Sequence, residues 1–119
     1  MSRVLLIDDE PGMAGLVSMC IEKAEVTRVG NLRQAVDAAR ERPPDLVLLD
    51  LALGSEDGLD ILPDLRAEPV LSKVPIVAFT VHGSREREAM ALGTDAFVSK
   101  PFKPAALRAA VAPFLEGIS

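Results

Sequence analysis

The hydrophobic residues of this chain form five short runs that alternate with segments of helical periodicity. Four runs are nearly continuous, as in strands buried on both faces, and one alternates apolar with polar residues like an edge strand. The expected strands cover residues 4–7, 25–29, 45–50, 75–80 and 96–100. Apolar residues at helical spacing predict helices over residues 11–23, 31–42, 59–68, 84–92 and 104–115.

Three residues are expected to set the limits of these helices. Asn31 precedes the second helix and suits a cap, because its side chain can accept a hydrogen bond from the first turn. Pro63 should interrupt or reshape the third helix, and Pro113 should shorten the last one, because proline has no N–H to donate.

Strands that alternate with helices predict an α/β domain, with a parallel sheet that is doubly wound by helices on both faces. There is no repeat, linker or low-complexity stretch, so residues 1–119 are expected to form one domain. Right-handed crossovers leave few topologies. The carboxyl ends of all five strands then share one edge of the sheet, which is where ligands bind in open α/β folds.

Several residues with reactive or charged side chains follow the strands and should gather at that edge: Asp8, Asp9, Glu10, Asp50, Thr80 and Lys100. Carboxylates brought together repel one another, and a hard cation such as Mg²⁺ relieves that repulsion. A hydroxyl and an ammonium group can bind phosphoryl oxygens, and an aspartate can accept a phosphoryl group. The set therefore suits Mg²⁺-assisted phosphoryl transfer to Asp50.

Taken singly, each of these residues has an ordinary structural explanation. Asp8 and Asp9 suit the start of a helix, and Asp50 suits a helix cap or loop. Thr80 is an ordinary strand residue, and Lys100 alone is an ordinary surface charge. It is their common position at one edge that favours a site.

Five fragments of the chain, in this order and spacing, resemble those of response-regulator receiver domains: Leu6-Ile-Asp8-Asp9-Glu10-Pro11, Leu48-Leu-Asp50, Asp57-Gly58, Phe79-Thr80 and Phe97-Val-Ser-Lys100-Pro101. The resemblance covers essentially the whole chain. It implies a flavodoxin-like receiver fold of five helices and a five-stranded parallel sheet, with strand order 2-1-3-4-5.

The resemblance also implies a ligand set around the phosphoacceptor. Asp50 corresponds to the residue that receives the phosphoryl group and binds Mg²⁺. Asp9 corresponds to a direct Mg²⁺ ligand, and Asp8 to an acid that holds the ion through water. The backbone carbonyl of Ala52 corresponds to the third protein ligand.

Three further roles are implied in the same way. Lys100 should contact Asp50 before phosphorylation and a phosphoryl oxygen after it. Thr80 should bind another phosphoryl oxygen and move toward it, and Phe97 stands at the position of the aromatic switch residue. The bond between Lys100 and Pro101 corresponds to the family's cis peptide.

By this resemblance, the chain accepts a phosphoryl group from a histidine kinase or phosphotransfer protein and controls a partner or an output domain. The surface formed by residues 84–92, 96–100 and 104–115 should change on phosphorylation and can support a homodimer. The chain should catalyse only its own phosphorylation and dephosphorylation, without being a turnover enzyme. It is expected to be either a stand-alone regulator or part of a longer one.

Two other functions remain as alternatives. A pseudo-receiver would keep the fold as a protein-interaction module without being phosphorylated, and Val81, where the family usually has a small residue, favours it by narrowing access to Asp50. A small Mg²⁺-dependent phosphohydrolase of the haloacid dehalogenase type would need an acid where Ala52 stands. Gly54 occupies a position where the family often has proline, which should loosen the loop.

Composition limits the binding partners and the cellular compartment that we expect for this chain. The net charge of −5 argues against direct binding of nucleic acid or an anionic membrane by this domain. Cys20 is the single cysteine, so an intramolecular disulfide is excluded. The first apolar run is too short for a signal peptide, and no stretch could span a bilayer, so a cytoplasmic protein is expected.

Overall fold

The computed structural model describes residues 2–54, 56–81 and 85–115. Within them, strands and helices alternate along the chain as the hydrophobic pattern predicts. The elements are β1 (Ser2–Ile7), α1 (Met13–Cys20), β2 (Ala24–Val29), α2 (Leu32–Glu41), β3 (Leu46–Asp50), α3 (Gly58–Ala67), a short 3₁₀ turn (Pro69–Leu71), β4 (Ile76–Thr80), α4 (Glu86–Ala91), β5 (Ala96–Ser99) and α5 (Pro104–Val111).

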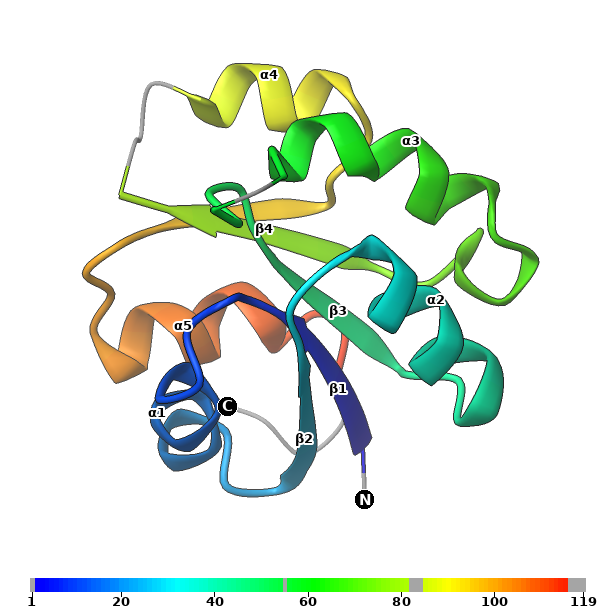
Figure 1. Cartoon of the computed structure of the whole chain (residues 1–119). Helices are drawn as coiled ribbons and strands as arrows, with labels where there is room; N and C mark the ends of the chain where they lie inside the picture. Colours follow the sequence, from blue (N-terminus) through cyan, green and yellow to red (C-terminus); the bar gives the residue numbers. More distant parts are fainter. Residues whose placement is uncertain (1, 55, 82–84, 116–119) are drawn as a thin grey trace.

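The strands form one parallel sheet in the order β2-β1-β3-β4-β5 (Figure 1). This confirms the fold class and the strand order expected from the sequence. Strand β3 lies at the centre and is buried throughout, whereas β2 lies at an edge and is largely half-exposed. Ile7 pairs with Leu49, and Asp50 pairs with Phe79, so the segments that follow β1, β3 and β4 leave the sheet side by side.

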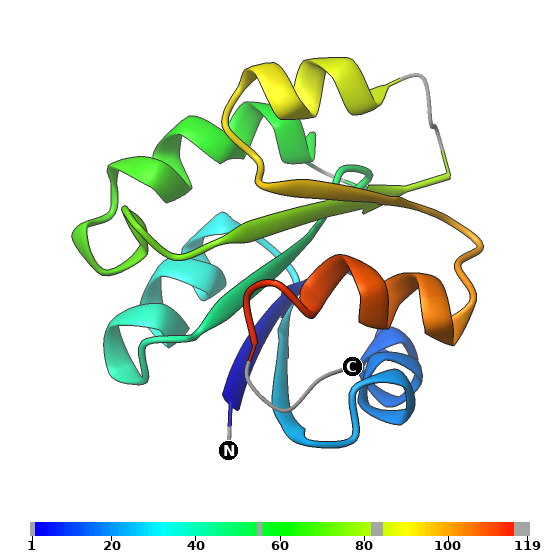
Figure 2. The ribbon, with the colours of Figure 1, turned by 180° about the vertical axis from the view of Figure 1, so that it is seen from behind.

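Helices α2, α3 and α4 cover one face of the sheet, and α1 and α5 cover the other (Figures 1 and 2). Neighbouring strand residues point to opposite faces, so β1 supplies Leu5 and Ile7 to one core cluster and Val4 and Leu6 to the other. Burying each such side chain contributes roughly 1.5–3 kcal/mol, which is how a sheet covered on both faces is held together.

The expected caps and breaks are partly confirmed. Asn31 caps α2, because its side chain accepts a hydrogen bond from the N–H of Gln34 at 2.9 Å. Pro63 was expected to interrupt or reshape α3, and the interruption is wrong, since the helix is continuous from Gly58 to Ala67. Pro63 lies on the exposed side of α3, and the opposite side buries a row of apolar residues that holds the helix on the sheet: Leu59, Ile61, Leu62 and Leu65.

Helices α1 and α5 end well before the residues that the periodicity predicts. Helix α1 ends at Cys20, because Ile21 leaves the helical conformation with φ −123° while its side chain remains buried. Helix α5 ends at Val111, two residues before Pro113, which has no N–H to extend the helix. The expected start of the fourth helix at Ser84 lies outside the described residues. No described helix has the length and apolar character that crossing a membrane requires.

Candidate functional site

Three carboxylates converge at the carboxyl ends of β1 and β3. Asp8, Asp9 and Asp50 each offer an oxygen atom, and these atoms all lie within 4.8 Å of one another. Asp8 and Asp50 are almost fully buried, at 0% and 4% exposure, whereas Asp9 is exposed. Buried carboxylates at this spacing repel one another, so the cluster has the chemistry of a cation site.

Lys100 supplies a positive charge to the buried part of this cluster. Its Nζ lies 3.1 Å from Asp50 Oδ2 and 3.4 Å from Asp8 Oδ2. The ammonium group also lies 4.6 Å from the centre of the Phe79 ring, in a cation–π arrangement. The bond between Lys100 and Pro101 is cis, as the resemblance implied. The structure thus brings residues 8, 50 and 100 together from three parts of the chain.

The two carboxylate oxygens of Asp50 have different partners. Oδ1 accepts a hydrogen bond from the N–H of Ala52 at 2.9 Å, and Oδ2 accepts one from Lys100. Burial raises the pKa of Asp50 above its ordinary value, while the bonds from Ala52 and Lys100 act in the opposite direction without offsetting burial. A nearby cation would therefore favour the charged form of this aspartate.

Ala52 belongs to a short loop that folds back on itself after β3. It forms an isolated antiparallel bridge with Asp57, and the hydrogen bonds of that bridge run from Leu53 N to Glu56 O and from Gly58 N to Leu51 O. The bridge therefore does not use the Ala52 carbonyl, and no donor within the described part of the chain reaches it. The Ala52 carbonyl therefore has no hydrogen bond from the described residues, and its role as a ligand stays a prediction.

Two glycines allow this loop to pass close to the acids. Gly54 has φ +73°, and a Cβ there would lie 2.9 Å from Asp9 Oδ2. Proline cannot adopt a positive φ, so the path that this loop takes at Gly54 excludes the proline that is common in the family. A Cβ at Gly58 would lie 2.6 Å from Asp50 O and from Leu51 Cα, so this position also excludes a side chain.

Thr80 is the last residue of β4 and is 1% exposed. Its carbonyl accepts a hydrogen bond from the N–H of Lys100 at 2.8 Å, which joins the ends of β4 and β5. Thr80 lies one residue beyond Phe79, which pairs with Asp50 across the sheet. The strand register therefore carries Thr80 to the edge where the acids meet.

The remaining expected residues lie around the site. Phe97 on β5 is half-buried and packs against the core cluster beneath α2, α3 and α4. Val81 is 61% exposed, so most of its surface faces solvent.

Three contacts near the site had no signal in the sequence. Arg85 donates two hydrogen bonds to the carboxylate of Asp57, which also caps α3 through the N–H of Leu59. Glu56 accepts a hydrogen bond from the N–H of Leu32 at the start of α2. Arg28 donates to the carbonyl of Asp8. Each contact joins residues more than 15 positions apart, so local periodicity could not reveal it.

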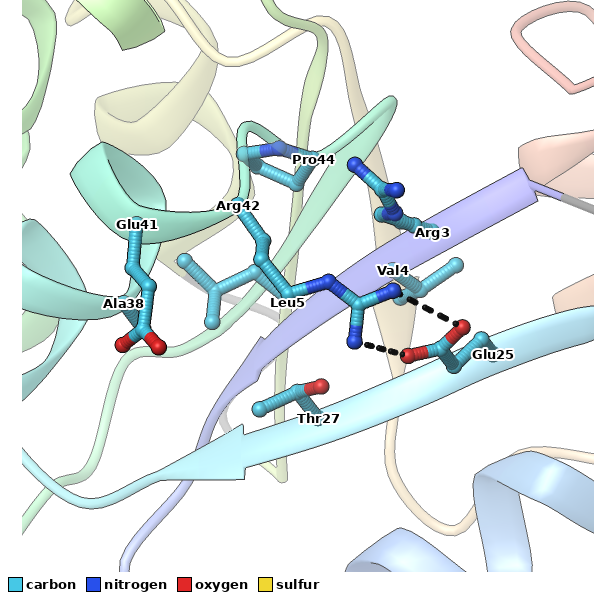
Figure 3. Close-up of a pocket in the computed structure, with 9 residues that line it drawn as sticks. All are labelled: Arg3, Val4, Leu5, Glu25, Thr27, Ala38, Glu41, Arg42 and Pro44. Atoms are coloured by element: carbon cyan, nitrogen blue, oxygen red, sulfur yellow. Dashed lines mark hydrogen bonds and ion pairs between the residues drawn. The ribbon is translucent and has the colours of Figure 1, made fainter.

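A cavity of about 170 Å³ lies between β1, β2 and the end of α2 (Figure 3). Its lining residues in β1 and β2 lie between Arg3 and Leu5 and between Glu25 and Thr27, with others at the end of α2, whereas the acids follow the carboxyl ends of the strands. The Arg42–Glu25 ion pair, at 2.7 Å, lies beside it. This cavity is therefore not part of the acid site.

Known proteins resemble this chain over most of its length. Residues 4–112 match the family model of the response regulator receiver domain. The DNA-binding response regulator MtrA of Mycolicibacterium smegmatis is 40% identical over 113 residues, which cover 92% of this chain and 48% of that protein. The chain thus spans about half the length of the curated relatives that it matches.

Solved structures show the same fold. The chemotaxis protein CheY4 of Vibrio cholerae has a TM-score of 0.86 at 24% identity, and the match covers 97% of this chain and 99% of that one. The receiver domain of the sensor histidine kinase PA1611 from Pseudomonas aeruginosa has a TM-score of 0.82 at 28% identity, with 95% and 96% coverage. That structure holds a magnesium ion coordinated in its active site cleft.

The five-stranded fold, the acid cluster with its lysine and the match over residues 4–112 agree with one another. This chain belongs to the family of response regulator receiver domains, the phosphoacceptor modules of two-component signalling.

Proposed function

We propose that Asp50 is the phosphoacceptor of this receiver domain, with a phosphorylated histidine of a kinase or phosphotransfer protein as the donor. The observation that carries the proposal is the surroundings of its carboxylate. It is buried, it lies within 4.8 Å of the Asp8 and Asp9 oxygens, and it is 3.1 Å from Lys100 Nζ. An aspartate held in this way is a competent nucleophile for phosphoryl transfer.

The same residues fit a magnesium ion. Asp9, Asp50 and the Ala52 carbonyl would bind it directly, and Asp8 would hold it through water, since Mg²⁺ prefers oxygen ligands and keeps several waters. The ion would supply positive charge that offsets the carboxylates and the phosphoryl oxygens. The exposed side of Asp9 leaves this part of the cluster open to an ion from solvent.

In the transfer step, an Asp50 carboxylate oxygen attacks phosphorus as the P–N bond of phosphohistidine breaks. A new P–O bond forms an acyl phosphate, and the donor histidine leaves as a neutral imidazole after gaining a proton. Lys100 and Thr80 bind phosphoryl oxygens as charge develops on them. Hydrolysis reverses the modification, because water attacks phosphorus and releases inorganic phosphate and the Asp50 carboxylate.

Phosphorylation would then favour one of two conformations of the domain. Binding of a phosphoryl oxygen by Thr80 draws the end of β4 toward Asp50, and Phe97 on the neighbouring strand repacks. The surface formed by α4, β5 and α5 changes with them, and it would signal to an output domain, a partner or a second copy of the chain.

The domain itself would comprise residues 1–119 and act in the cytoplasm. The output activity would belong to the remainder of a longer protein or to a partner, because this chain covers 48% of its relative MtrA, which is a DNA-binding regulator. The net charge of −5 supports placing any contact with nucleic acid outside this domain.

The proposal is tested by intact mass spectrometry after incubation with acetyl phosphate, with Mg²⁺ and with a chelator. We expect the gain of one phosphoryl group only with Mg²⁺, and no gain in the Asp50→Asn variant. Labelling of Asp50→Asn to the same extent as the natural sequence would refute the assignment. Absence of labelling with both acetyl phosphate and a phosphorylated histidine donor would favour the pseudo-receiver alternative.

A further inference from the structure

Arg28 reaches from the edge strand to the backbone of the acid cluster. It is the last residue but one of β2, and its side chain is half-buried. Its Nη1 donates a hydrogen bond to the backbone carbonyl of Asp8 at 2.9 Å. This is a contact with the main chain, so it constrains the path of the chain through the acids.

The position of Arg28 explains why the contact is needed. The pairing of β1 with β2 ends at Ile7 and Val29, and one more bond runs from Asp8 N to Val29 O at 2.9 Å. Beyond that point β2 gives way to the cap of α2 at Asn31. A side-chain donor thus serves the Asp8 carbonyl where the regular strand pairing has ended.

The peptide groups on both sides of Asp8 are therefore held by β2, through Val29 O and Arg28 Nη1. The side chain of Asp8 is held as well, since Oδ1 accepts from Glu10 N at 2.8 Å and Oδ2 lies 3.4 Å from Lys100 Nζ. Asp9 follows directly, and no hydrogen bond holds its exposed carboxylate within the described residues. The direction of its Cα–Cβ bond is set by the backbone that precedes it.

We infer that Arg28 is a positioning residue for magnesium binding, because it fixes the peptide between Asp8 and Asp9 and so aims the Asp9 carboxylate at the ion site. This inference rests on the proposed function, which assigns the ion to that cluster. Partners that orient metal ligands affect metal affinity although they do not touch the ion.

If Arg28 acted mainly through its charge, its removal would have the opposite effect on Mg²⁺ affinity to the loss of a positioning contact. A guanidinium beside the acids repels Mg²⁺, so removing it should strengthen binding if electrostatics were its main role. Removing a positioning contact should weaken binding. The direction of the change in affinity therefore separates the two roles.

The test is the dissociation constant for Mg²⁺ itself, measured by calorimetry and by amide chemical shifts. Three proteins are compared: the unsubstituted chain, Arg28→Met and Arg42→Met. Methionine keeps an apolar stem and lacks a donor. Arg42 is the matched control, because it also binds a residue of β2, Glu25, but far from the acids. Both substitutions change the net charge equally.

We expect Arg28→Met to weaken Mg²⁺ binding roughly tenfold, the low end for residues that orient metal ligands, and Arg42→Met to leave it unchanged. If Arg28→Met fails to fold, Arg28→Thr serves in its place, because threonine suits an edge strand and cannot reach Asp8. Unchanged or tighter binding in the folded variant, or absence of Mg²⁺ binding by the natural sequence, overturns the inference.

The outcome is separable from that of the proposed function. Weaker Mg²⁺ binding by Arg28→Met together with no phosphorylation of the natural sequence would support the positioning role and refute the phosphoacceptor. Phosphorylation of Asp50 in the unsubstituted protein, together with unaltered Mg²⁺ affinity in Arg28→Met, would support the phosphoacceptor and refute the positioning role.

Discussion

Arg85 and Asp57 join two segments that leave neighbouring strands of the sheet. Arg85 Nη2 lies 3.0 Å and 2.8 Å from the two carboxylate oxygens of Asp57. Asp57 belongs to the loop that follows Asp50, and Arg85 immediately precedes α4. The pair therefore connects the loop beside the proposed phosphoacceptor with the helix at the proposed signalling surface.

The first prediction concerns the protonation of Asp57. Hydrogen bonds from Arg85 hold the pKa of this carboxyl below its ordinary value, so we expect the pKa to rise in Arg85→Gln. A titration of the Asp57 carboxyl carbon by NMR measures it in both proteins. An equal pKa in both would show that the ion pair does not persist in solution.

The same pair predicts a pH dependence of stability. The pKa of Asp57 is lower in the folded than in the unfolded chain. The stabilisation is therefore present above the unfolded pKa and is lost as the pH falls through the lowered folded pKa. Since the Asp57 side chain is 40% exposed, solvent and salt keep the effect small. Chemical denaturation at several pH values measures this effect. The free energy of unfolding should fall less on acidification in Arg85→Gln than in the unsubstituted protein.

The second prediction concerns Lys100. Replacing it with methionine removes the cation nearest to Asp50, so the pKa of Asp50 should rise further and phosphoryl oxygens should lose a partner. Loss of one such electrostatic contact costs about 10²–10³-fold in rate. We expect acetyl phosphate to label Lys100→Met slower by that factor. Lys103→Met, which removes an exposed lysine, should label at the natural rate; equal rates for both variants would contradict the role of Lys100.

The third prediction concerns Val81, the residue that favours a pseudo-receiver. Its side chain is 61% exposed, so Val81→Ala should change the free energy of unfolding by less than about 0.5 kcal/mol. If its branched side chain narrows the approach to Asp50, labelling by acetyl phosphate should be faster in Val81→Ala. The labelling rate and the stability are measured on the same preparations. An unchanged rate would remove the basis for the pseudo-receiver alternative at this position.

The fourth prediction concerns the close approach at Gly58. An added Cβ would lie 2.6 Å from backbone atoms of Asp50 and Leu51. Backbone atoms cannot relieve such a clash by changing rotamer, as a side chain can. We expect Gly58→Ala to destabilise the fold by about 1–3 kcal/mol, the usual range for overpacking.

Gly15→Ala is the matched control for Gly58→Ala. Gly15 lies inside α1, and nothing lies within 4 Å of an added Cβ there. Alanine should stabilise that helix by about 0.5–1 kcal/mol, because it loses less backbone freedom than glycine on folding. Urea denaturation of the two variants should therefore show shifts of opposite sign.

Much of this protein could be predicted from the order of its residues. Continuous apolar runs identified the strands, and helical spacing identified the helices between them, because burial on one or both faces requires these periods. A parallel sheet then brings the carboxyl ends of its strands to one edge, which was sufficient to place Asp8, Asp50 and Lys100 together.

Other features were decided only by tertiary structure. The continuity of α3 through Pro63 depends on packing against the sheet, which outweighs the hydrogen bond that proline cannot make. The close approach of Gly54 to the Asp9 carboxylate arises only once the loop has folded over the acids. Arg28 and Arg85 acquire their partners from residues 20 and 28 positions away. Local sequence specifies which elements form, but contacts of this kind exist only after the strands have assembled, because the assembled sheet sets the distances between their ends.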